Sequence, residues 1–399
     1  MSNMFSKQKR IYFDNASATK IDPRVLKEIK KTSKMIFANP GSIHRDGVLA
    51  FESLEMARRG VAKDIGSLPD EIIFTSGATE SNNLVIRGLS DYLSRTGIDL
   101  KDQHFISTEI EHPSVKEILR YLGTCGAKVD FLPVNKEGFF DFRELKAKIT
   151  KQTVLVSLSY ANGEIGVIND VKELMKTIRY FRKENKTVFP FVHLDASQGF
   201  LLDLNVQKFG IDFMVLDGQK MYGTKGSGIL YKRRGTPLGA ILYGGHQEGG
   251  LRAGTENVCS AVCFSKALNL AVKNRKRELK KISKLRDWLW EQIKENFPQA
   301  VLNGSLENRL VGNLNFSLPG QNRELLVLRL DAMGISISAG SACQKSEDSY
   351  VLKAITDDEK IIKSSVRVSL GRFNTKRECK RFIKVLKKIL DITTHGGKS

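Results

Sequence analysis

Two residues of opposite charge follow neighbouring apolar segments of the sequence. Asp195 closes the apolar run 191–194, and Lys220 comes shortly after the next run, 213–216. In α/β sheets the carboxyl ends of parallel strands meet at one edge, where ligands bind. Pyridoxal phosphate (PLP) requires a lysine that forms a Schiff base with its aldehyde and a carboxylate that pairs with its pyridinium nitrogen. The same spacing also fits a lysine on the surface and an aspartate that caps a helix, so the spacing alone does not establish a PLP site.

A turn of small residues offers a place for a phosphate. The sequence Ser76-Gly77-Ala78-Thr79 joins a predicted strand, 72–75, to a helical pattern. Small residues let backbone N–H groups face a phosphate, and the N-terminus of a helix favours an anion. Because Gly and Ser also form ordinary turns, this signal is weak by itself.

The elements that must position these groups alternate between strand and helix over the first two thirds of the chain. Strands are predicted at 72–75, 104–107, 128–132, 154–159, 188–194 and 213–216. The alternation predicts an α/β fold whose large domain is built on a mostly parallel sheet covered on both faces.

The remainder of the chain has a different pattern. After the Gly-rich stretch 244–254, a long helical region reaches residue 297, and short strands and helices follow. This pattern predicts a smaller α+β C-terminal domain. We expect an N-terminal segment near the active site (1–20), a large PLP-binding domain (21–259) and a small domain (260–399).

Composition limits the class of protein. With 41% hydrophobic and 27% charged residues, the chain fits a globular protein. No apolar run approaches the roughly 20 residues that span a bilayer, and the basic start lacks the apolar core of a signal peptide. We therefore expect a cytoplasmic protein without membrane contact. Cys259 and Cys263, four apart, fit a packed helix better than a zinc site, so no metal is expected.

The net charge of +20 is concentrated in the segments 273–286 and 376–388. Both segments carry apolar residues at helical spacing, which favours amphipathic helices with solvated basic faces. A surface for nucleic acid or an acidic partner is the alternative. Because no nucleic-acid motif accompanies the charge, nucleic-acid binding is not expected.

Short strings distributed over nearly the whole chain resemble cysteine desulfurases of the class V aminotransferase group, which are fold-type I PLP enzymes. The strings that carry the resemblance are Tyr12-Phe13-Asp14-Asn15-Ala16, Asn39-Pro40-Gly41-Ser42-Ile43-His44, Thr75 to Asn83, Glu111-His112, His193 to Gln198, Lys220-Met221-Tyr222-Gly223, Gly254-Thr255-Glu256-Asn257, Gly340-Ser341-Ala342-Cys343 and Arg367 to Arg372. Each string is moderately specific, and their common order strengthens the resemblance.

The resemblance implies a role in PLP binding for a set of matching positions. His112 matches a catalytic histidine that stacks on the ring, Asp195 the partner of the pyridine nitrogen, and Lys220 the Schiff-base lysine. The remaining implied cofactor contacts are Ala78 and Thr79 at the phosphate, Gln198 at the phenolic oxygen, Asn162, Asp217, Gln219, and Thr255, which would reach the phosphate of a partner subunit. Thr255 thereby implies a homodimer.

The resemblance also implies the reaction. Asn162 and Arg367 match the pair that holds the carboxylate of the substrate, L-cysteine, and the fork of arginine suits that task. Lys220 would remove the α-proton, and Cys343 matches the catalytic cysteine that takes the sulfur as a persulfide. The expected products are alanine and sulfur for an acceptor protein, such as an iron–sulfur scaffold, or for tRNA thiolation.

Two residues depart from the family pattern. The family usually has Ser or Thr at position 217 and His at position 219, where this chain has Asp217 and Gln219. Both family residues bind the cofactor phosphate, so the departures put cofactor affinity in doubt. Two alternatives therefore stay open: another PLP lyase, such as a selenocysteine lyase, and a degenerate PLP-fold binding partner. The cysteine at position 343 favours the desulfurase over the lyase.

Overall fold

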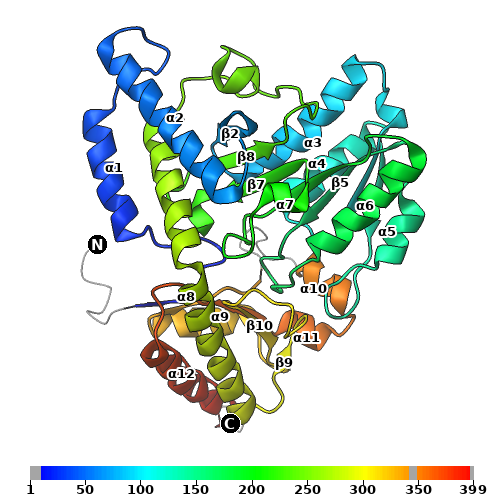
Figure 1. Cartoon of the computed structure of the whole chain (residues 1–399). Helices are drawn as coiled ribbons and strands as arrows, with labels where there is room; N and C mark the ends of the chain where they lie inside the picture. The colour runs from blue at the N-terminus through cyan, green and yellow to red at the C-terminus, as the bar shows by residue number, and fades with distance from the viewer. Residues whose placement is uncertain (1–9, 341–347, 396–399) are drawn as a thin grey trace.

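The computed structural model describes residues 10–340 and 348–395, with the side chains up to Asp391 (Figure 1). A seven-stranded sheet with helices on both faces forms the upper part of the molecule. A smaller layer of strands and helices lies below it, and one long helix joins the two.

The central sheet runs in the order β2-β8-β7-β6-β5-β3-β4. Strands β3 to β7 pair in parallel, whereas β8 is antiparallel to both of its neighbours. The seven strands are β2 (Ile72–Thr75), β3 (His104–Thr108), β4 (Lys128–Leu132), β5 (Thr153–Ser159), β6 (Phe191–Asp195), β7 (Phe213–Asp217) and β8 (Gly228–Lys232).

Helices cover the sheet because alternate strand residues are apolar on both faces. In β7, Met214 and Leu216 belong to one core cluster with Leu174 and Ile178, whereas Val215 belongs to another with Leu89. The helices of this part are α1 (Pro23–Met35), α2 (Arg45–Ile65), α3 (Ala78–Arg95), α4 (Pro113–Thr124), α5 (Phe142–Lys148), α6 (Val171–Asn185) and α7 (Val206–Phe209).

The lower layer holds two small sheets. β10 pairs antiparallel with β9 and β12, and β1 pairs in parallel with β11. Its strands are β1 (Ile11–Tyr12), β9 (Val301–Leu302), β10 (Asn313–Ser317), β11 (Ile335–Ser336) and β12 (Ser365–Ser369). Its helices are α9 (Arg323–Ala332), α10 (Tyr350–Ile355), α11 (Glu359–Lys363) and α12 (Lys376–His395).

Helix α8 (Val258–Asn296) links the two layers. Its first half packs in the core of the large sheet through Phe264 and Leu268, and its second half packs in the lower core through Ile282 and Leu289. The division expected between residues 259 and 260 therefore falls in the first turn of a continuous helix, and the change of core occurs further along it.

The structure confirms the α/β fold with a mostly parallel sheet. The strand predicted at 188–194 starts later, at Phe191, because Pro190 has no N–H for the ladder. Within the described residues, no helix has the length and apolar character to cross a membrane.

Candidate active site

A cavity of about 280 Å³ opens at the carboxyl ends of β5, β6 and β7. It gathers nearly all of the described residues that the sequence predicted for the site. Its lining includes Ala78, Thr79, His112, Asn162, Asp195, Gln198, Asp217, Gln219, Lys220 and Arg367.

Two predicted residues are not part of this lining. Thr255 is exposed in the loop before α8 and does not line the cavity of its own chain. Cys343 lies outside the described residues. The residues flanking that segment do reach the site: Tyr350 lines the cavity, and Gly340 lies close to Glu164, another lining residue.

Asp195 ends β6 with a fixed, buried carboxylate. Its Oδ1 accepts hydrogen bonds from the backbone N–H and the hydroxyl of Ser197, at 3.0 and 2.6 Å. Its Oδ2 accepts from Nδ2 of Asn82, at 2.8 Å. These hydrogen bonds fix the position of the carboxylate, and a carboxylate is the partner that a pyridinium nitrogen requires.

His112 caps the N-terminus of α4 and is linked to the same network. The backbone N–H of Ser114 donates to His112 Nδ1 at 3.2 Å, so this nitrogen acts as an acceptor. The hydroxyl of Ser114 also accepts from Asn82, which binds Asp195. Desolvation by the surrounding protein lowers the pKa of His112, the charge of Asp195 opposes this shift, and the charge of Lys220 adds to it. The imidazole is therefore neutral at pH 7, which suits a ring that stacks on a cofactor.

Lys220 ends a short 3₁₀ helix after β7 and reaches the N-terminal segment. Its Nζ donates to the carbonyl oxygens of Ala16 and Ser17, at 2.9 and 2.7 Å. Gln198 donates to the Ala16 carbonyl as well, at 2.9 Å. Ala16 and Ser17 thus form part of the wall of the cavity.

The turn from Ser76 to Thr79 leads directly into α3. Gly77, with φ of 152°, precedes α3 and supplies no capping side chain, so the first-turn N–H groups lack a side-chain cap. Asp217 lies beside this turn: a Cβ atom built on Gly77 would be 3.9 Å from Asp217 Oδ2. The two oxygens of Asp217 accept from the backbone N–H and from Nε2 of Gln219, at 3.0 and 3.2 Å.

Arg367 on β12 is a buried guanidinium with one atom unsatisfied. Nη1 donates to the Gly163 carbonyl at 3.0 Å, and Nη2 donates to Asp14 and to Ser17 Oγ at 2.9 and 2.8 Å. Its buried Nε has no hydrogen-bond partner within the described part of the chain. A buried donor without a partner is costly, and the positive charge of this guanidinium at the cavity suits an anionic ligand.

The side chain of Asn162 makes more hydrogen bonds within the chain than the Nε of Arg367 does. Its Oδ1 accepts from the N–H groups of Glu164 and Ile165, at 2.8 and 2.9 Å, and its Nδ2 donates to the Ile110 carbonyl. One amide proton is left for a ligand. The side chain mainly shapes the loop after β5, and its role at a substrate carboxylate stays a prediction.

Two buried carboxylates were not predicted. Glu164 lines the cavity, accepts from Ser349 Oγ at 2.5 Å, and has its pKa raised by burial. Burial raises the pKa of Glu111 to about 7. The string that contains Glu111 was noted, but residue type alone does not reveal that a glutamate is buried.

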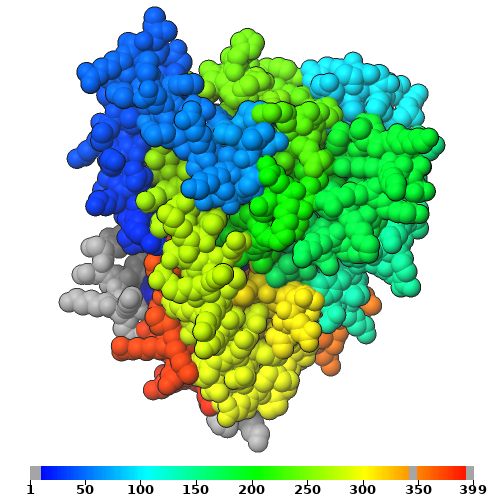
Figure 2. All heavy atoms as spheres, in the orientation of Figure 1, coloured from blue at the N-terminus to red at the C-terminus, as the bar shows by residue number. Residues whose placement is uncertain are grey.

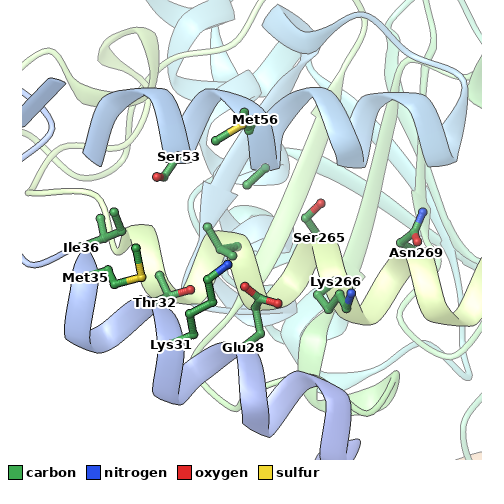
Figure 3. Close-up of a pocket in the computed structure, with 12 residues that line it drawn as sticks. Glu28, Lys31, Thr32, Met35, Ile36, Ser53, Met56, Ser265, Lys266 and Asn269 are labelled. Atoms are coloured by element: carbon green, nitrogen blue, oxygen red, sulfur yellow. The ribbon is translucent and has the colours of Figure 1, made fainter. Parts of the chain in front are cut away.

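A second, larger cavity of about 380 Å³ lies between α1, α2 and α8 (Figure 3). Glu28 and Lys31 of α1 face Met56 of α2 and Lys266 of α8 across it. None of the predicted site residues line it. We therefore assign the chemistry to the smaller cavity at the strand ends.

The donor set of the smaller cavity fits PLP. Lys220 supplies an amine, Asp195 a buried carboxylate, His112 a neutral ring, and the N-terminus of α3 a site for the phosphate. Arg367 lines the same cavity. This set of side chains is typical of a PLP enzyme.

Comparison with known proteins gives the same class. The aminotransferase class-V family model matches residues 11–382. A cysteine desulfurase IscS of Dictyoglomus turgidum is 38% identical over 387 residues, which covers 96% of this chain and 95% of the relative. A mitosomal cysteine desulfurase of Trachipleistophora hominis is 39% identical over 398 residues, which covers 96% of this chain and 88% of the relative.

Solved structures of NifS-like proteins have the same fold as this chain. A NifS-like protein superposes with a TM-score of 0.88 at 34% identity and covers 96% of this chain and 100% of its own. A NifS-like protein from Rickettsia africae superposes with a TM-score of 0.83 at 30% identity, with 96% and 100% covered. The chain belongs to the class V aminotransferase family, and within it to the PLP-dependent cysteine desulfurases.

Proposed function

We propose that this chain converts L-cysteine to L-alanine, leaves the sulfur as a persulfide on Cys343, and passes it to an acceptor protein such as an iron–sulfur scaffold. The observation that carries the proposal is the grouping of Lys220, Asp195, His112 and Arg367 around one cavity. The relatives named cysteine desulfurase support the choice of substrate.

The cofactor would be held by residues from four elements. Asp195 would pair with the ring nitrogen, His112 would cover the ring, Lys220 would bind the aldehyde carbon, and the turn at Ala78 and Thr79 would receive the phosphate. Bound PLP draws electrons from the α-carbon of an amino acid and so makes its α-proton acidic.

Three groups of the chain act on the substrate. Arg367 would receive the carboxylate, and its buried contacts with Asp14 and Gly163 fix the plane of its guanidinium. The amine of Lys220 would accept the α-proton and return it.

The Cys343 thiolate attacks the substrate sulfur. The carbon–sulfur bond breaks as the sulfur–sulfur bond forms, and a proton added to the remaining carbon skeleton completes alanine. Cysteine and one enzyme thiol thus become alanine and one enzyme persulfide, so no external oxidant is needed.

A homodimer is part of the proposal. Helices α1 and α2 and the loop between them expose large apolar side chains, which in a monomer would face water. These are Leu26, Met35, Phe37, Ile43, Phe51 and Met56, with exposed fractions of 45, 62, 78, 99, 52 and 62%. Thr255 is exposed and outside its own cavity, as a residue serving the partner's site would be. The mass in solution tests this part.

The direct test of the function is to incubate the purified protein with L-cysteine and a thiol reductant, and to measure sulfide and alanine together. We expect equal amounts of the two products, and neither from Lys220→Ala. Sulfide accompanied by pyruvate instead of alanine would indicate a different lyase. Full PLP loading with no product would leave only a binding role.

A further inference from the structure

The helices α8 and α12 carry most of the net positive charge of the chain. The segment 273–286 has eight Lys or Arg residues and one acidic residue, and the segment 376–388 has seven and one. Together these 27 residues hold a net charge of +13 out of +20. The site chemistry uses none of this charge.

Twelve of these cations are exposed, and they form what we call the basic surface. Its members are Lys273, Lys276, Arg277, Lys280, Lys281 and Lys284 on α8, and Lys376, Arg377, Lys380, Lys384, Lys387 and Lys388 on α12. Within the described residues, none of the twelve forms a salt bridge with a carboxylate. Their charge is therefore not neutralised by the fold.

The two helices place their cations on adjoining surfaces. Lys376 at the start of α12 lies over the ring of Trp288 on α8, 5.1 Å from its centroid, and Lys281 donates to the Arg372 carbonyl at 2.7 Å. Figure 2 shows the start of α12 beside the lower half of α8 on one face of the molecule. The sequence predicted two separate solvated faces, whereas the structure joins them.

Spacing along α8 makes an extended row of charge. Lys273, Arg277, Lys280 and Lys284 follow at intervals of three and four residues, which puts them on one side of the helix. At a rise of 1.5 Å per residue the row is about 16 Å long. A polyanion with closely spaced charges can contact several of these cations at once.

The apolar content of the two helices distinguishes between the possible partners. Every large apolar side chain of α8, and of the described part of α12, is buried or half-buried. Specific protein interfaces have an apolar centre and are depleted in Lys. Binding to a phosphate backbone does not require an apolar centre and tolerates many Lys residues, because release of counterions drives it. The surface therefore fits nucleic acid better than an acidic protein.

We propose that the basic surface binds the phosphate backbone of nucleic acid without reading its sequence. This surface is separate from the PLP cavity, and its function does not depend on the desulfurase reaction. Bound nucleic acid would bring the enzyme close to a polymer without occupying the active site.

The test uses the full-length holoenzyme and random 20-base-pair DNA and RNA duplexes, with binding measured by fluorescence anisotropy over a series of salt concentrations. For six contacted phosphates, the slope of log K against log salt should be about −5 for DNA. The triple variant Lys276→Gln, Lys280→Gln, Lys284→Gln should bind more weakly and have a slope smaller by about 2–3. Its PLP absorbance and desulfurase rate should match those of the parent, which shows that it folds.

A matched control separates the surface from the overall charge. Lys146→Gln, Lys151→Gln, Lys172→Gln changes the net charge equally at exposed lysines outside the two helices. It should keep the parent slope. Equal losses in both triple variants would overturn the proposal, as would binding without salt dependence. Tighter binding of poly-glutamate than of either duplex would also overturn it and indicate an acidic protein partner.

Discussion

Asp217 and Gln219 bind each other in the wall of the cavity, next to the turn that receives the phosphate. The carboxylate is 6% exposed and accepts from two N–H groups of Gln219. Arg252, which could have paired with it, forms a salt bridge with Glu80 instead. The negative charge of Asp217 is therefore partly compensated by hydrogen bonds from amide groups and, among the described residues, not by a salt bridge.

These bonds do not remove the negative charge. Two unit charges 4 Å apart interact by about 4 kcal/mol at an effective dielectric of 20. We therefore predict that Asp217→Ser with Gln219→His tightens PLP binding, measured by titration of the apoprotein at fixed salt. Gln219→Ala alone should weaken binding, since it leaves Asp217 without the side-chain amide. A double variant that binds PLP no tighter than the parent would show that Asp217 is a productive part of the phosphate site.

Arg367 should determine how tightly cysteine binds. Arg367→Lys keeps the charge but loses the planar fork that contacts Gly163 and Asp14. The expected loss is about 1–3 kcal/mol in the apparent binding of cysteine, seen as a higher KM, with unchanged PLP absorbance. Arg143→Lys, at an exposed arginine, serves as the control. An unchanged KM would remove Arg367 from the substrate site.

Glu111 should make stability depend on pH. Burial raises its pKa from 4.5 to about 7. Between pH 4.5 and about 7, Glu111 loses its proton in the unfolded chain but keeps it in the folded chain. The contribution of Glu111 to the free energy of unfolding therefore falls as pH rises, by up to about 3 kcal/mol.

The variant Glu111→Gln should flatten that part of the pH dependence of the free energy of unfolding, measured with urea from pH 4 to about pH 8. Glu117→Gln, at an exposed glutamate of α4, should not. Parallel curves for the parent and Glu111→Gln would show that Glu111 titrates near its ordinary pKa.

At the scale of elements, the phosphate turn depends on the strand beside it. Gly228 starts β8 and pairs with Thr75 on one side and Asp217 on the other. A Cβ at this position would lie 2.6 Å from Gly77 Cα and 2.8 Å from Gly77 C. Because both are backbone atoms, the turn itself would have to move.

Gly228→Ala should therefore cost about 1–3 kcal/mol of stability and weaken PLP binding together. Gly123→Ala is the matched control, because its nearest neighbour, a Val129 methyl, is at 3.6 Å. Thermal unfolding and PLP titration of both variants check the prediction. Normal PLP affinity in Gly228→Ala would show that the turn tolerates the shift.

The sequence predicted six of the seven strands of the large sheet, because buried strands read as apolar runs, and it missed β8, the strand that runs antiparallel to its neighbours. β4 has the predicted bounds, whereas β6 starts at Phe191 because of Pro190. The helices α1 and α2 were not predicted. Helix α1 is amphipathic and begins with Asp22 as its cap and Pro23 in its first turn, which are the sequence signals of such a helix.

At the scale of the whole molecule, the site was predicted in part. Asp195 and Lys220 follow from strand ends, since the topology of a parallel sheet brings such ends together. Arg367 comes from β12 in the lower layer, and only the family resemblance connected it with the cavity. Glu164 and the carbonyl groups that hold Lys220 depend on tertiary packing, which no local pattern encodes.

At the same scale, the chain on the far side of the segment 341–347 returns to the cavity. Tyr350 lines it and donates to the Glu111 carbonyl at 2.5 Å, and Ser349 donates to Glu164, another lining residue. That Cys343 accepts the sulfur is the central claim of the proposed function.

The most direct test of that claim is the mass of the peptide carrying Cys343 after the holoenzyme has been treated with L-cysteine in the absence of reductant. The peptide should gain one sulfur atom, and one alanine should be released per site. Cys343→Ser should bind PLP normally but release neither alanine nor sulfide. Sulfide release by Cys343→Ser at the parent rate, or the added sulfur on another cysteine, would contradict the account.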